Sequence, residues 1–90
     1  MNVISLEKIL DHICQTFDIS NDDIKSKSRE QNIVNARYVY FYFASKYTFK
    51  SAIIIAKLVN KGRTSVYHAI KESENKYNTK LNKMINKVTF

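Results

Sequence analysis

The sequence predicts an all-α fold: one compact domain of about five to six helices over residues 1–90. The chain is long enough for one modest hydrophobic core but not for two. It contains a single glycine, Gly62, and no proline. Tight β-hairpins and phosphate-cradling loops need residues at positive φ, which glycine adopts most easily, so an all-β fold and a P-loop enzyme are both disfavoured. Apolar residues also recur at helical spacing along most of the chain.

The first expected helix covers residues 5–17, and Ser5 is placed to cap its N-terminus. Ser20 begins a second, short helical turn, in which the spacing Ser20-x-x-Asp23 is typical of a capping box. Residues 25–31 are polar and indicate a connection. The apolar positions of the first helix are Leu6, Ile9, Leu10, Ile13 and Phe17.

Residues 32–47 carry conflicting signals. The run from Tyr38 to Phe43 is aromatic and β-branched, which on propensity alone suggests a buried strand. The apolar stretch, however, extends from Ile33 to Tyr47 without a turn residue, which is longer than a typical strand. A helix that is buried on most sides accommodates this length, with tyrosine hydroxyls at the edge of the core. We therefore expect a buried helix rather than a strand or a platform for stacking single-stranded bases.

Three further helices are expected in the C-terminal half. A short helix covers residues 51–59 and breaks at residues 60–62. A second helix covers about residues 63–77, and a joint follows within residues 76–80. The last helix is amphipathic, because lysines lie opposite an apolar side. That apolar side consists of Leu81, Met84, Ile85 and Val88.

The formal net charge of +7 is distributed unevenly along the chain. Residues 1–45 contain five lysines and arginines against six acidic residues, whereas residues 46–90 contain ten against two. A solvated lysine-rich surface is the simplest interpretation. Segregation this strong nevertheless favours a polyanionic partner, either nucleic acid or an acidic membrane surface.

Residues 52–71 have the spacing of a helix-turn-helix motif. Two helices that cross through a tight turn need a small residue at the crossing, and Ala56 supplies it. Four residues later the chain must leave the first helix in a left-handed conformation, and asparagine, here Asn60, is the usual substitute for glycine. An arbitrary helical hairpin is the alternative that the spacing leaves open. The side chains expected to pack between the two helices are Ile55, Val59, Val66 and Ile70.

The exposed side of the second helix of this motif has the chemistry of a DNA reader. A guanidinium and two short hydroxyls, from Arg63, Thr64 and Ser65, open the end that enters the major groove in helix-turn-helix proteins. Arginine binds guanine bidentately, and threonine meets a base edge or a thymine methyl. The residues spaced along the same side are Thr64, Tyr67, His68 and Lys71. The lysines expected to contact phosphates around the motif are Lys46, Lys50, Lys57 and Lys61.

Four segments carry a family resemblance: residues 24–29 (Ile-Lys-Ser-Lys-Ser-Arg), 36–37 (Ala-Arg), 44–48, and 64–69 (Thr-Ser-Val-Tyr-His-Ala). They resemble the C-terminal DNA-binding domain, domain IV, of the bacterial replication initiator family DnaA, over nearly the full chain. The resemblance implies a compact all-α fold of the Trp-repressor-like class that contains a helix-turn-helix. It also implies sequence-preferring binding of double-stranded DNA, with helix 63–77 in the major groove.

The family pattern at the second helix is Arg-Asp-His-Thr/Ser-Thr-Val-x-His-Ala. Gly62 and Arg63 stand where the pattern has aspartate and histidine, while Thr64 and Ser65 match it. The resemblance implies that these two hydroxyl residues read bases and that Arg37 reaches the minor groove. Because the aspartate and the histidine are replaced, we expect a target sequence other than the family's usual one.

No catalytic, metal-binding or cofactor-binding pattern occurs in the sequence, and we expect no enzymatic activity. The pattern Gly-x-x-x-x-Gly-Lys-Ser/Thr is not found, so we expect the initiator's ATPase module to be absent. Cys14, the single cysteine, is expected to be a small buried hydrophobe rather than a reactive thiol. The longest apolar run is too short to cross a bilayer, and no signal pattern is present, so we expect a cytoplasmic protein without a membrane partner.

The sequence leaves two alternatives open. His68 is equally suited to a phosphate contact and to a structural hydrogen bond. The alternative function is a helical protein-interaction module, in which the helix-turn-helix is a scaffold and the basic C-terminal helix docks a protein partner or an acidic membrane.

A free-standing domain that resembles the initiator's DNA-binding domain would serve as a regulator, as a competitor for origin sites, or as a protein of a phage or mobile element.

Overall fold

Six α-helices make up residues 5–88, the part of the chain that this computed structural model describes, so the predicted all-α fold is confirmed. Residues 5–88 contain no strand. The helices are α1 (Leu6–Phe17), α2 (Asn21–Lys25), α3 (Gln31–Tyr47), α4 (Ala52–Lys57), α5 (Arg63–Ser73) and α6 (Thr79–Lys87).

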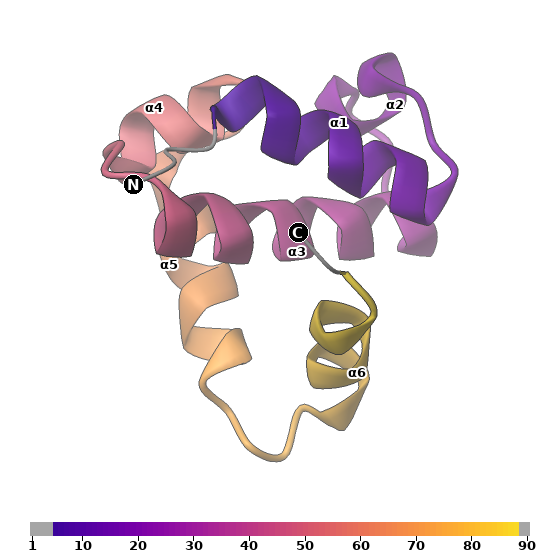
Figure 1. The fold of residues 1–90 in the computed structure, drawn as a ribbon, viewed down its shortest axis with the longest axis vertical. Helices are drawn as coiled ribbons and strands as arrows, with labels where there is room; N and C mark the ends of the chain where they lie inside the picture. Colours follow the sequence, from indigo (N-terminus) through magenta and orange to yellow (C-terminus); the bar gives the residue numbers. More distant parts are fainter. Residues whose placement is uncertain (1–4, 89–90) are drawn as a thin grey trace.

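Helix α3 lies at the centre of the domain and contacts each of the other five helices. Figure 1 shows α1, α2 and α4 on one side of α3, and α5 and α6 on the opposite side. A single apolar cluster with side chains from all six helices fills the space between them. Because α3 touches every element, its position determines where the α4–α5 pair lies.

The central position of α3 explains why its strand-like sequence forms a helix. Tyr40 and Phe41 are at most 1% exposed, and Phe43 is also buried. A strand would point alternate side chains at two opposite faces, whereas a helix surrounded by other helices buries apolar side chains on several sides. The interpretation as a buried helix is therefore confirmed, and the ring faces of these residues are not available for base stacking.

Local side-chain caps fix several helix ends. The Ser5 hydroxyl accepts a hydrogen bond from the N–H of Lys8. Ser20 and Asp23 form a reciprocal capping box, with bonds of 3.0 and 3.1 Å between each side chain and the other residue's backbone N–H. Both predicted caps are confirmed. The Asn78 side chain also caps α6, because it accepts a hydrogen bond from the N–H of Leu81.

Helix α5 is shorter than the sequence predicted. It was expected to reach about Tyr77, but it ends at Ser73. The Ser73 hydroxyl donates to the carbonyl of Ile70 at 2.6 Å, and the Asn75 side chain accepts from the N–H of Tyr77 at 3.0 Å. Serine and asparagine side chains compete in this way for backbone groups that would otherwise extend a helix. Tyr77, which follows this early end of the helix, is 81% exposed.

The amphipathic α6 uses its apolar side within the domain. Leu81 and Val88 are buried, and Met84 and Ile85 are partly buried against the same core. These residues therefore belong to the core and do not form a free docking face. None of the helices in residues 5–88 is long and apolar enough to span a bilayer.

Candidate nucleic-acid interface

The turn between α4 and α5 has the geometry that the spacing predicted. Asn60 adopts the left-handed conformation, with φ 59°. Its N–H donates to the carbonyl of Lys57 at 3.1 Å, and the N–H of Lys61 donates to the carbonyl of Ala56 at 3.0 Å. These two bonds are those of a Schellman motif, which ends a helix abruptly. Ala56 is fully buried, as a residue at a close helix crossing must be.

The contact between α4 and α5 is apolar, and α3 packs against both helices. Ile55, Val59 and Val66 are at most 1% exposed, and Ile70 packs against the same cluster. The hydroxyl of Tyr40 on α3 donates to the carbonyl of Ile55 at 2.9 Å, so it also satisfies a polar group in α4. Burial raises the pKa of Tyr40 above its ordinary value, and the hydroxyl therefore stays a donor. The helix pair is thus held rigidly on the core.

The outer side of α5 is open to solvent. Ser65 is half-buried at the start of the helix. The ring of Tyr67 is 57% exposed. Arg63 is exposed at the start of α5. The other exposed side chains include the four that the helical spacing placed together, Thr64, Tyr67, His68 and Lys71.

Gly62 is the N-cap residue of α5 and provides no side-chain cap. A Cβ added at this position would meet no atom within 4 Å, so there is open space beside Gly62. The exposed N-terminus of α5 carries the positive end of the helix dipole, and the guanidinium of Arg63 adds a full charge beside it. This end of α5 therefore favours an approaching anion.

His68 lies on the exposed side of α5 but makes a contact with α3. Its ring meets that of Tyr38 edge to face, with 5.7 Å between the ring centroids. This contact is between rings, and the phosphate contact and the structural hydrogen bond that the sequence left open for His68 both stay predictions. The His68 ring thus helps to orient α5 against the central helix.

Arg37 is not part of the exposed surface, which corrects its expected position. Its side chain is 6% exposed. Its guanidinium donates to the carbonyls of Ile24 and Ser28, each at 2.8 Å, to that of Asp23 at 3.4 Å, and to that of Ser26. The resemblance had implied a minor-groove contact, but here this side chain is occupied inside the protein. The last carbonyls of α2 have no N–H partner within the helix, because the helix ends there. The Arg37 guanidinium donates hydrogen bonds to them instead.

Two of the four carbonyls that bind Arg37, those of Ser26 and Ser28, belong to the basic loop, residues 25–29, which the structure brings next to the helix-turn-helix. The Asn60 side chain donates to the carbonyl of Lys25, and the ammonium of Lys61 donates to that of Ser26, both at 3.2 Å. Burial, followed by the charges of Arg37, Lys27 and Arg29, lowers the pKa of Lys61 below its ordinary value. The loop's cations are therefore close enough to act on the turn.

Lys27 and Arg29 are exposed beside these residues, and neither was predicted as a binding residue from the sequence. The alternation Lys-Ser-Lys-Ser-Arg over the loop could have indicated that these cations are exposed. Serines that bond to the backbone point inward, and the cations between them then point outward. Their proximity to Lys61 depends on the tertiary fold and is not visible in the sequence.

Lys46 lies at the end of α3, among aromatic rings. Its ammonium is 5.5 Å from the ring centroid of Tyr42 and 5.7 Å from that of Tyr47. It also donates a 3.3 Å hydrogen bond to the Tyr42 hydroxyl, and this bond raises the pKa of Lys46 above its ordinary value. The lysine thus keeps its positive charge, but its nearest partners are rings of α3 and not residues of α5.

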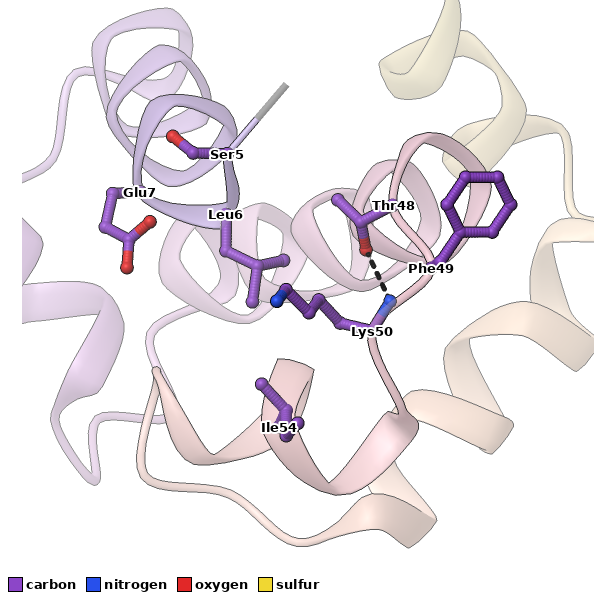
Figure 2. Close-up of a pocket in the computed structure, with 7 residues that line it drawn as sticks. All are labelled: Ser5, Leu6, Glu7, Thr48, Phe49, Lys50 and Ile54. Carbon is purple, nitrogen blue, oxygen red and sulfur yellow. Dashed lines mark hydrogen bonds between the residues drawn. The ribbon is translucent and has the colours of Figure 1, made fainter. Parts of the chain in front are cut away.

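Lys50 lies in a groove of about 580 Å³ between the start of α1 and the segment before α4. Figure 2 shows its side chain extending toward Leu6, while the Phe49 ring points away from it. The ring of Phe49 is 94% exposed. The structure therefore does not group Lys50 with the exposed side of α5. The groove is lined by Ser5, Leu6, Glu7, Thr48, Phe49, Lys50 and Ile54.

An exposed basic helix, packed across a second helix through a tight asparagine turn, defines the class of this molecule. It is a small helix-turn-helix domain of the DNA-binding type. Within residues 5–88, no group of three or more histidine, cysteine, aspartate or glutamate side chains is arranged to hold a metal ion.

Residues 6–72 match the family described as the bacterial dnaA protein helix-turn-helix, and the chain belongs to this family. Several similar curated proteins bear the name chromosomal replication initiator protein DnaA. The chain is 37% identical to the one from Nautilia profundicola over 96% of its own length, and 36% identical to the one from Campylobacter curvus over 94%. It is 36% identical to the one from Bacteroides thetaiotaomicron over 76% of its length. The chain spans 21%, 21% and 15% of these three relatives, respectively.

Proposed function

We propose that this chain binds double-stranded DNA with sequence preference by inserting α5 into the major groove. The observation that carries the proposal is the row of exposed side chains on α5, held outward by the turn at Asn60 and by the apolar contact with α4. Arg63 and Thr64 open the helix and are suited to base edges. Tyr67 and Lys71 follow one and two turns later on the same side and are suited to the flanking backbone.

The basic loop supplies a second contact in this proposal. Lys27 and Arg29 are exposed next to Lys61, whose pKa is lowered by burial and by neighbouring cations. A phosphate placed among these cations relieves their mutual repulsion, because it brings negative charge beside them. We therefore expect the loop to bind the DNA backbone beside the site that α5 reads.

The names of the relatives support a place for this DNA binding in the control of chromosomal replication. The proposed activity is binding and not catalysis. We expect the preferred sequence to differ from that of the relatives, since Gly62 and Arg63 replace two readers of the family pattern at the start of α5.

The test is to select a preferred duplex from a random library and to measure its affinity for single variants. Arg63→Ala and Thr64→Ala should each weaken binding by about 1–3 kcal/mol and relax the choice of sequence, because each removes a side chain suited to a base edge. Fluorescence anisotropy gives the affinities, and a repeated selection with each variant gives the sequence preference.

The matched control is Thr79→Ala, which removes an exposed threonine from the first turn of α6, away from α5. Its affinity should equal that of the wild type. If Arg63→Ala and Thr64→Ala also bind as tightly as the wild type, α5 is not the reading helix.

A further inference from the structure

We propose that Arg37 is a positioning residue for DNA binding: it fixes the basic loop against the turn of the helix-turn-helix, so that the loop and α5 meet DNA as one rigid surface. Arg37 itself does not touch DNA. This inference rests on the proposed function and adds to it the residue that sets the spacing between its two contacts.

The guanidinium of Arg37 binds four carbonyls, two at the end of α2 and two in the basic loop. Its Nε and Nη1 atoms donate to the carbonyls of Ile24 and Ser28, and its Nη2 atom donates to those of Asp23 and Ser26. The four carbonyls cover the end of α2 and most of the loop. Only the planar fork of an arginine presents donors in so many directions from one side chain, whereas a lysine ammonium has three donors at a single point.

One of these carbonyls and its neighbour also bond to the turn between α4 and α5. The carbonyl of Ser26 accepts from Arg37 and from the ammonium of Lys61, and the neighbouring carbonyl of Lys25 accepts from the Asn60 side chain. The loop is thus held by α3 on one side and by the turn on the other. Without the Arg37 guanidinium, the two bonds of 3.2 Å from Asn60 and Lys61 would be the remaining side-chain bonds described between the loop and the helices that follow it.

The serines complete this arrangement without carrying charge. The Ser26 hydroxyl donates to the carbonyl of Asp23 and accepts from the N–H of Ser28, and the Ser28 hydroxyl accepts from the N–H of Glu30. Both serines are half-buried. The alternating Lys27 and Arg29 are therefore directed outward by bonds that do not involve them.

A double-mutant cycle tests the proposal, with a fluorescein-labelled duplex of random sequence and the selected duplex as probes. Arg37→Gln should lower affinity as much as the double variant Lys27→Ala/Arg29→Ala. Combining the changes should lower it no further, within about twofold. The salt slope should fall by about two in both cases, one for each lost phosphate contact. If Arg37→Gln only impaired folding, it would lower affinity equally in the wild type and in the Lys27→Ala/Arg29→Ala variant. It would also leave the salt slope unchanged.

Arg37→Lys separates positioning from direct contact, since it keeps the charge but not the fork. We expect the same loss as for Arg37→Gln, whereas full affinity with Arg37→Lys would overturn the proposal. Lys8→Gln removes one exposed charge from α1 and is the matched control, with affinity expected within about twofold of the wild type.

If the Arg37 variants do not fold, Ser26→Ala/Ser28→Ala provides the same test, because it loosens the loop and leaves every charge in place. Its loss of affinity should vanish in the Lys27→Ala/Arg29→Ala background. Losses that add in the cycle would refute the positioning role while leaving DNA binding intact. A wild-type chain that binds neither probe would instead refute the proposed function itself.

Discussion

Burial determines the chemistry of Cys14. The side chain is 4% exposed, and its thiol lies 3.8 Å from the carbonyl of Ser20. Burial, with a smaller contribution from Asp11, raises the pKa of this thiol from 9.0 to about 11. Since the thiolate is the reactive form, a protonated buried thiol is inert. The expectation of a small buried hydrophobe at this position is thus confirmed.

We predict that Cys14 is protected from thiol reagents in the native chain near pH 8 and becomes reactive in urea. Because the unfolded thiol ionises at lower pH than the native thiol, the native state loses stability as pH rises from 9.0 to about 11. The free energy of unfolding of the wild type should therefore approach that of Cys14→Ala over this range. A difference that stays constant with pH would contradict this assignment.

At the scale of elements, α3 organises the contacts of the other helices. Its hydrogen bond from Tyr40 to the carbonyl of Ile55 holds α4, and its ring contact from Tyr38 to His68 holds α5. Both contacts come from the aromatic run that on propensity alone resembled a strand. These tyrosines therefore connect the central helix to each half of the helix-turn-helix.

Tyr40→Phe should lower the free energy of unfolding by about 1–2 kcal/mol, because it removes a buried hydrogen bond while leaving the ring in place. Urea denaturation measures this change. Tyr42→Phe is the matched control, since its hydroxyl is bonded only to the exposed ammonium of Lys46 among the bonds described, and we expect little effect. Equal free energies of unfolding for Tyr40→Phe and the wild type would show that the bond to Ile55 does not stabilise the fold.

At the scale of the whole molecule, the fold brings together cations that lie far apart in the sequence. The acidic N-terminal half contributes the basic loop, and the lysine-rich C-terminal half contributes the turn and α5. They meet where the Asn60 and Lys61 side chains bond to the loop. The candidate surface is therefore continuous across the two halves, although the net charge along the chain is segregated.

A continuous cationic surface predicts steep salt dependence. With about 6–10 phosphate contacts, affinity for a duplex of random sequence should fall by roughly three to five orders of magnitude between about 50 and 200 mM salt. Fluorescence anisotropy at several salt concentrations measures the slope. Lys80→Gln/Lys83→Gln on α6 should leave the slope unchanged, since these lysines lie outside α5 and the basic loop. A slope near zero for the wild type would argue against phosphate binding.

The sequence by itself determined the helices, the left-handed turn at Asn60 and the exposed row on α5. These features depend on the spacing of neighbouring residues, which a helix converts directly into faces and ends. The end of α5 at Ser73 was not predicted, because the apolar spacing indicated a longer helix. The Ser73 and Asn75 side chains bond to nearby backbone groups and end the helix earlier.

Only the tertiary structure decided the place of Arg37 and the neighbourhood of Lys27, Arg29 and Lys61. An arginine on a helix is equally consistent with a surface contact and with a buried bond, and the choice depends on which carbonyls the rest of the chain brings to it. Those carbonyls lie at the end of α2 and in the basic loop, nine or more residues away along the chain. Contacts of this kind depend on how separate elements pack, and local spacing carries no information about them.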